Sequence, residues 1–291
     1  ALSALHKLLE NTTTFMLEHL RHWLPAVLQR LLSRNADVAE EAHRVGRTLR
    51  HVTAATSAST VSTSKKSASS TIADVAAENA SVLLNRARAR INENDEKSHV
   101  IVAKFFGVLA HTLGKRMNDV DTGGNDAIDG NGDGRGSRSY NMQLCVLATQ
   151  LFSLNDADVH IAALHSWRLY ATTLVDVLGS VDALVKSPAR ISMLVRPVLA
   201  MVPASSAEST PLLLLLHRQR VMTWQHIVSL LRDRLVLVFD DVVSAFFRQQ
   251  IAHRRIDSSL LLQLASILDA PVSSDDSGGD GGGGGGGGGG G

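Results

Sequence analysis

Apolar residues recur with a helical period along most of the chain. Val102, Phe105, Phe106, Leu109 and Leu113 fall on one side of a helix, because residues three and four apart share a face. No convincing run alternates apolar and polar residues as a half-buried strand requires. The pattern therefore predicts a string of amphipathic helices, with approximate spans 1–10, 12–22, 25–34, 37–55, 71–92, 96–117, 139–154, 156–178, 188–202, 210–231, 235–253 and 257–269.

Helices of this length, joined by short turns, suit an open stack. They fit roughly five to six repeats of ~40 residues each, as in HEAT or armadillo proteins. The segment 96–117 is apolar over more than half of its circumference, which indicates neighbours on two sides. We therefore predict an all-α, HEAT/armadillo-like α-solenoid of antiparallel helix pairs. A globular helical bundle is the alternative, because the repeats do not align with one another by eye.

Several residues mark where helices should begin. Pro25 and Pro188 suit a first helical turn, where the missing N–H costs no hydrogen bond. Three further pairs have the spacing of an N-cap residue and its N3 partner. They are Asp37 with Glu40, Thr71 with Asp74, and Asn155 with Asp158.

Three segments break the helical pattern. Residues 56–70 are rich in Ser and Thr, and residues 118–138 are rich in Gly and Asp. Residues 271–291 end in a run of glycine, which cannot bury surface and loses much backbone entropy on ordering. We therefore predict one helical-repeat domain at 1–270, with disordered inserts at 56–70 and 118–138, and a disordered tail at 271–291. An open array tolerates inserts because each repeat packs only on its neighbours.

Composition narrows the classes of function. The 291 residues include a single Cys, which excludes a disulfide framework and a Cys-rich zinc site. No segment supplies the roughly 18 uncharged apolar residues of a membrane span, so we expect no membrane partner. The net charge of +1 conceals a body of +9, because 118–136 and 269–291 each carry −4. A modestly basic body is compatible with a polyanionic partner but does not require one.

One short motif resembles half of a calcium loop. Asp129, Asn131 and Asp133 match the oxygen ligands at positions 1, 3 and 5, and Gly134 matches the turn glycine at position 6. Position 12 is Tyr140, where a bidentate Glu is needed. We therefore interpret 129–134 as a solvated loop. A calcium-gated helical protein would rest on this half-loop alone.

The remaining residue types give no catalytic constellation. His19 and His22 share one predicted helix, and His160 and His165 share another, but no third ligand falls at a matching spacing. Cys145 lies on an apolar helix face, where a buried and inert thiol is expected. No phosphate-binding loop or nucleophile elbow is present. We therefore predict no metal, no cofactor, no small-molecule substrate and no enzyme activity.

Basic residues are the remaining candidate site. Arg44, Arg47 and Arg50 recur every third residue and cover an arc of ~120° on one helix. Arginine forks suit phosphate oxygens, and stacked helices can align them along one surface. The alternative is an ordinary solvated helix face. The candidate nucleic-acid-binding residues are Arg44, Arg47, Arg50, Arg86, Arg90, Arg218, Arg220, Arg232 and Arg234.

Three motifs occur in order between residues 99 and 230. The first motif, Ala-x-x-x-Trp-basic, has Trp167 and Arg168 as its last two residues. The second, Ser-x-x-Arg-aliphatic-x-x-Leu-x-x-Pro, has Pro197 as its last residue, and the third, basic-x-x-x-Trp, has Trp224. In this order and spacing they resemble the N-terminal helical-repeat domain of the Rap-interacting factor family, the telomere-associated regulators of replication timing and break repair. Departures from the family include Gln225 in place of a second aromatic, the insert at 118–138, which lengthens a family loop, and the absence of the phosphatase-docking motif.

The resemblance implies a non-catalytic scaffold that binds DNA or chromatin partners in the nucleus. Trp167 and Trp224 are expected to be anchors buried between helix pairs, each with its indole N–H bonded to a carbonyl. Pro197 is expected to bend or end its helix. The alternative is an adaptor of the same fold that binds only proteins. The sequence leaves a homo-oligomer open.

Overall fold

The computed structural model describes residues 1–58, 65–93, 95–119, 139–200 and 210–252, with two short helical pieces at 261–262 and 265–266. Within these ranges the regular structure is entirely helical. The α-helices are α1 (Leu2–Asn11), α2 (Thr13–Glu18), α3 (Leu20–Arg30), α4 (Ala36–Ala58), α5 (Lys65–Ile91), α6 (Glu96–Leu113), α7 (Tyr140–Ser153), α8 (Ala157–Leu178), α9 (Val181–Val185), α10 (Pro188–Leu199), α11 (Thr210–Leu231) and α12 (Ala245–Ala252). Three irregular helices join them, namely the 3-10 helices η1 (Gly114–Asn118) and η2 (Arg232–Val238) and the π-helix η3 (Asp240–Ser244).

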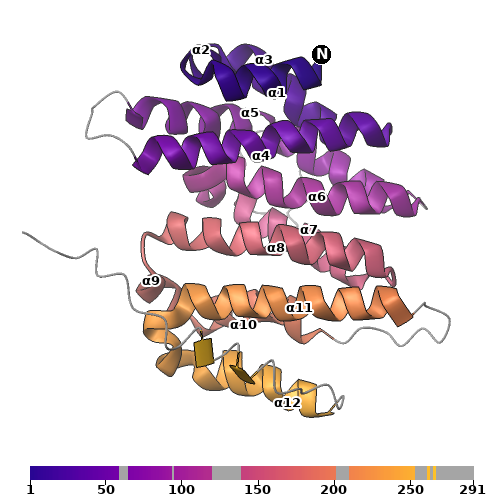
Figure 1. The fold of residues 1–291 in the computed structure, drawn as a ribbon, viewed down its shortest axis with the longest axis vertical. Helices are drawn as coiled ribbons and strands as arrows, with labels where there is room; N and C mark the ends of the chain where they lie inside the picture. The colour runs from indigo at the N-terminus through magenta and orange to yellow at the C-terminus, as the bar shows by residue number, and fades with distance from the viewer. Residues whose placement is uncertain are drawn as a thin grey trace, which may run out of the picture.

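The helices form an elongated stack of two layers. In the first layer α4, α6, α8 and α11 lie one below another, each in contact with the next (Figure 1). In the second layer α3, α5 and α7 contact one another in turn, and α10 lies behind α11. The chain alternates between the layers, so each helix pair contacts mainly the pairs before and after it. The predicted all-α, HEAT-like solenoid is therefore confirmed.

The core runs along the stack between the two layers. Its densest part is the contact of α6 with α8, where the ring of Trp167 lies 4.7 Å from that of Tyr170 and 5.8 Å from that of Phe106. Gly107 of α6 permits this approach, since a Cβ there would lie 2.8 Å from the Cα of Ser166. The apolar residues of 96–117 thus pack on two sides of the helix, against α8 and against α5.

Several helix boundaries differ from the prediction. Pro188 begins α10 as predicted, but Pro25 lies inside α3. The side chain of Asn35, rather than Asp37, caps the start of α4, and Asp156, rather than Asn155, caps α8. Thr71 begins no helix, because α5 already starts at Lys65. The short helix α9 was not predicted.

Both ends of the first predicted insert, residues 56–58 and 65–70, are helical. Helix α4 continues to Ala58 and α5 begins at Lys65, so only 59–64 of the predicted 56–70 insert lies outside the described residues. The physical reason is that no Gly or Pro occurs between residues 47 and 106 to stop a helix, and Ala, Ser and Lys tolerate one.

A main-chain hydrogen bond joins the two ends of the second predicted insert, residues 118–138. The N–H of Tyr140 donates to the carbonyl of Asp119 at 3.2 Å, so the two ends of this segment lie side by side. Residues 120–138, including the half calcium loop at 129–134, lie outside the described residues, as does the predicted tail at 271–291.

Candidate functional site

The two motif tryptophans lie inside the stack. Trp167 of α8 donates its indole N–H to the carbonyl of Leu194 on α10 at 2.9 Å. Trp224 of α11 donates to the carbonyl of Val242 at 3.0 Å and stacks on Phe246 of α12. Pro197 lies inside α10, two residues before the helix ends at Leu199. The two motif tryptophans therefore serve the packing between consecutive helix pairs.

Two predicted nucleic-acid-binding arginines are buried, which corrects their assignment to the surface. Arg220 is 4% exposed and donates through Nε and Nη2 to the carbonyl of Val198, at 3.2 and 2.7 Å. Arg90 is 7% exposed and donates to the Oγ of Ser98 at 3.3 Å, and its burial lowers its pKa. Because both guanidinium groups are buried and hydrogen-bonded inside the stack, neither is presented to phosphate. Arg220 in addition satisfies a carbonyl at the end of α10.

Arg234 links two connecting segments. Its Nε and Nη2 donate to the two carboxylate oxygens of Asp182 on α9, and this hydrogen bonding lowers the pKa of Asp182. Arg232 begins η2 and is half-buried. These two residues lie where η2 contacts α9, away from the outer face of α4 and α6.

The predicted stripe on α4 forms a charged network. The Nη2 of Arg47 lies 3.1 Å from Glu40, and the Nη1 of Arg44 lies 3.1 Å from Glu41. Lys104 of α6 donates to the other carboxylate oxygen of Glu40 at 2.8 Å. This hydrogen bond is the largest cause of the lowered pKa of Glu40. The side chain of Arg50 lies outside the described part of the structure.

Two further helices of the first layer carry basic residues. The Oγ of Ser166 on α8 donates to the carbonyl of Lys104, so this part of α8 packs next to the part of α6 that carries Lys104. Arg168 lies on the same helix, α8. Its Nη2 lies 2.9 Å from the Nδ1 of His165, and its Nη1 is buried without a hydrogen-bond partner. Thr223 of α11 donates to the carbonyl of Leu164, so α11, which carries the exposed Arg218, packs next to α8.

We call these five residues the cationic row: Arg44, Arg47, Lys104, Arg168 and Arg218. Sequence reasoning missed Lys104 and did not group Arg168 with the basic residues, because the cations come from four helices that only the stacking brings next to one another. Arg86 is exposed on α5, in the second layer, and is not part of the row.

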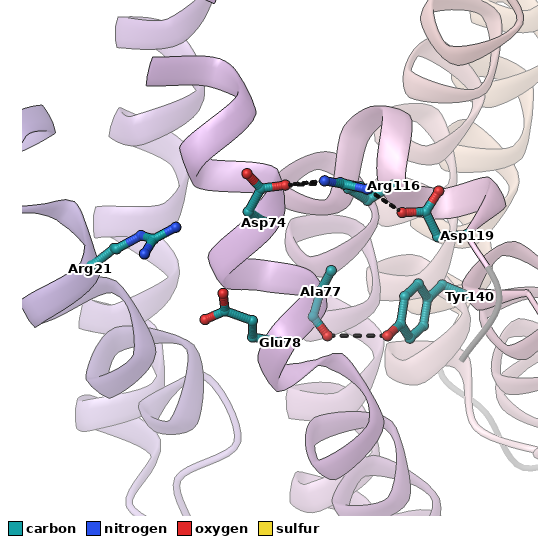
Figure 2. Close-up of a pocket in the computed structure, with 7 residues that line it drawn as sticks. All are labelled: Arg21, Asp74, Ala77, Glu78, Arg116, Asp119 and Tyr140. Atoms are coloured by element: carbon teal, nitrogen blue, oxygen red, sulfur yellow. Dashed lines mark hydrogen bonds and ion pairs between the residues drawn. The ribbon is translucent and has the colours of Figure 1, made fainter. Parts of the chain in front are cut away.

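A polar pocket of about 380 Å³ lies between α3, α5, η1 and α7 (Figure 2). Arg116 is held between two acids on its wall, with 2.6 Å from Nη2 to Asp74 and 2.8 Å from Nη1 to Asp119. These hydrogen bonds raise the pKa of Arg116. Figure 2 shows Arg21 of α3 opposite Asp74 and Glu78 of α5. Side chains of both charges line this pocket, which favours no single class of charged ligand.

A larger groove of about 810 Å³ lies at the first end of the stack, between α1, α3 and α4. Leu2, Leu5, Trp23 and Val27 line its apolar part. The indole of Trp23 donates to the carbonyl of Met16 at 2.9 Å.

The described residues contain no cluster of three or more His, Cys, Asp or Glu side chains placed to hold a metal ion. The pKa of the Cys145 thiol is raised by burial, and its Sγ lies 3.2 Å from the hydroxyl of Tyr170. A raised pKa disfavours the thiolate that a nucleophile requires. In the described part of the chain, no helix has the length and apolar character needed to cross a membrane.

Comparison with known proteins identifies the family of the chain. The family model described as Rap1-interacting factor 1 N terminal matches residues 1–236, which include all three motifs and α1 through most of η2. Searches of curated proteins and of solved structures gave no significant match. Because the family model covers most of the chain, the chain belongs to the Rap1-interacting factor 1 N-terminal family, a family of telomere-associated helical proteins.

Proposed function

We propose that this chain is a non-catalytic, nuclear scaffold that binds DNA at chromatin through the first layer of its helical stack. The observation that carries the proposal is the cationic row, in which four stacked helices carry the exposed Arg44, Arg47, Lys104 and Arg218 and the partly buried Arg168. Family membership supports a place at telomeres, and with it roles in telomere maintenance, replication timing and double-strand-break repair.

The dimensions of the row suit a polyanion. Packed helices lie roughly 8–10 Å apart, so four of them place cations over about 25–30 Å, a length that spans many phosphates of a DNA duplex. Glu40 and Glu41 neutralise part of the row, but half-exposed ion pairs contribute only about 0–1 kcal/mol. Phosphate can therefore replace these carboxylates as the partner of the cations at little cost.

The decisive test is DNA affinity as a function of salt for a row variant and a matched control. The row variant is Arg44→Gln, Arg47→Gln, Lys104→Gln. The control removes three exposed cations from other elements, Arg30→Gln, Lys186→Gln and Arg196→Gln. Binding of a fluorescent duplex is measured between about 50 and 200 mM salt, a range over which phosphate-driven affinity falls steeply. We expect the row variant alone to bind more weakly and to lose about 0.9 from the slope of log K against log salt for each phosphate contact removed.

A second candidate function is a protein-only adaptor of the same fold. It is favoured by the pairing of Arg44 and Arg47 with acids and by the burial of Arg90 and Arg220. Equal affinity and equal salt slope for parent, row variant and control would decide for this adaptor, because cations on solvated faces release no counterions on binding.

A further inference from the structure

An exposed apolar patch occurs where the chain passes from α11 to α12. Val236 is 89% exposed, Leu237 is 69% exposed and Phe239 is 44% exposed. Surface apolar residues are usually scattered singly, whereas these three fall within four consecutive residues. We call these residues, with the neighbouring acids Asp233, Asp240 and Asp241, the α11–α12 patch.

The backbone explains why these side chains point outward. Segment η2 is a 3-10 helix with three residues per turn, so residues three apart share a face. Leu235 and Val238 occupy the buried face, and the remaining positions, Val236, Leu237 and Phe239, project into solvent. An α-helical continuation of α11 would distribute the same residues differently, with a period of 3.6.

The patch is also held in place on both sides. Arg234 in η2 is paired with Asp182 of α9. The carbonyl of Val242 in the π-helix η3 accepts the indole N–H of the buried Trp224. A surface fixed in this way loses little conformational entropy when a partner binds.

The charges around the patch indicate the chemistry of the partner. Asp233, Asp240 and Asp241 are exposed, and none of them forms an ion pair within the described part of the chain. Of the neighbouring arginines, Arg232 is half-buried, Arg234 is paired with Asp182, and Arg248 donates to the main-chain carbonyls of Ser244 and Asp240. An apolar surface with an acidic rim repels DNA and anionic membranes, and it complements an apolar segment flanked by basic residues.

From these observations we propose that the α11–α12 patch docks a basic, amphipathic segment of a partner protein. Val236, Leu237 and Phe239 bury the apolar side chains of this segment, and the three aspartates face its Lys or Arg residues. The surface is separate from the cationic row, so one scaffold holds an anionic partner on the outer face of its first layer and a cationic protein segment at the α11–α12 connection.

The test uses a fluorescein-labelled synthetic helix with leucines on one face and lysines beside them, and a second peptide with each lysine replaced by glutamate. Anisotropy measures binding to the full chain. The patch variant is Val236→Ser, Leu237→Ser. Its matched control is Val82→Ser, Leu214→Ser, because these residues are 68% and 64% exposed on α5 and α11. Thermal melts establish that both variants fold like the parent, as expected for exposed positions.

We expect the parent to bind the basic peptide at least tenfold more tightly than the acidic one. The patch variant should lose about tenfold in affinity for the basic peptide, while the control retains it. Asp240→Asn, Asp241→Asn should weaken binding at low salt and flatten its salt dependence. Equal affinity for the two peptides, or equal affinity of patch variant and control, would overturn the proposal. Concentration-dependent dimerisation of the parent that the patch variant abolishes would instead assign the patch to a second copy of the chain.

Discussion

Helix α6 contacts a neighbour on each side within its layer, and the two contacts are built differently. Toward α8 it presents Phe106 and Gly107, which meet the ring of Trp167 and the backbone of Ser166. Toward α4 it presents Lys104, which pairs with Glu40 beside the buried His43. One contact consists of close apolar packing, and the other contains groups that titrate or exchange partners. We therefore expect stability to depend mainly on the α6–α8 contact and pH response on the α4–α6 contact.

The largest effect should come from removing the anchor of the α6–α8 contact. Trp167→Ala deletes a buried ring and leaves a cavity, so we expect it to lower the free energy of unfolding by about 3–5 kcal/mol. Urea denaturation measures this loss, and hydrogen exchange should show that α6, α8 and α10 lose protection first. Trp167→Phe is the control, because it keeps most of the ring volume and loses only the hydrogen bond to Leu194. A loss below about 1 kcal/mol for the alanine variant would refute the role of this ring as an anchor.

A pH-dependent effect of nearly the same size is expected at the α4–α6 contact. Burial lowers the pKa of His43 from its ordinary value of 6.5 to about 4, against the opposing influence of Glu40. The unfolded chain therefore binds a proton between pH 6.5 and 4 that the folded chain does not, and stability falls over this window as pH decreases. A difference of this size corresponds to about 3 kcal/mol, lost in full below about pH 4.

The variant His43→Leu removes this titration. Its stability at pH 7 should be close to that of the parent, because the Nε2 of His43 is buried without a hydrogen-bond partner. Unfolding in urea at pH 7 and at about pH 4.5 should show a smaller decrease for the variant than for the parent. Equal decreases would place the acid sensitivity at other groups.

The helical nature of the chain and the anchors of its repeats could be predicted from sequence, but the pairing of charges could not. Periodicity is a local signal, and it located most helices to within a few residues. Arg220 is indistinguishable in sequence from an exposed arginine, because its burial depends on a carbonyl 22 residues earlier. Lys104 lies 64 residues from Glu40, so their pairing depends on the spacing of stacked helices. The outward face of η2 was missed because its 3-10 period differs from the α-helical one.

A pair of glycines offers a direct comparison of the two contacts of α6. A Cβ at Gly107 would meet the backbone Cα of Ser166 at 2.8 Å, whereas a Cβ at Gly46 of α4 would meet only a methyl group of Val108 at 2.8 Å. Since a backbone cannot yield as a side chain does, Gly107→Ala should cost about 1–3 kcal/mol. Gly46→Ala should cost less than Gly107→Ala, because the gain in helix propensity of about 1 kcal/mol offsets part of the displacement of the Val108 side chain. Thermal melts of the two variants side by side would contradict this view if the Gly46 variant proved the less stable.

The smallest expected effect lies at Glu40, and it connects stability with binding. Glu40→Gln breaks ion pairs to Arg47 and Lys104 that are roughly half exposed, so the free energy of unfolding should fall by less than about 1 kcal/mol and by still less at high salt. The same change frees two cations of the row, and DNA affinity at low salt should therefore rise. Glu78→Gln on the exposed face of α5 is the control for charge alone. If both variants raise DNA affinity equally, the net charge of the chain governs binding. If only Glu40→Gln does so, the carboxylate competes with phosphate for Arg47 and Lys104, and the α4–α6 contact then belongs to the binding surface while the α6–α8 contact supports it from within.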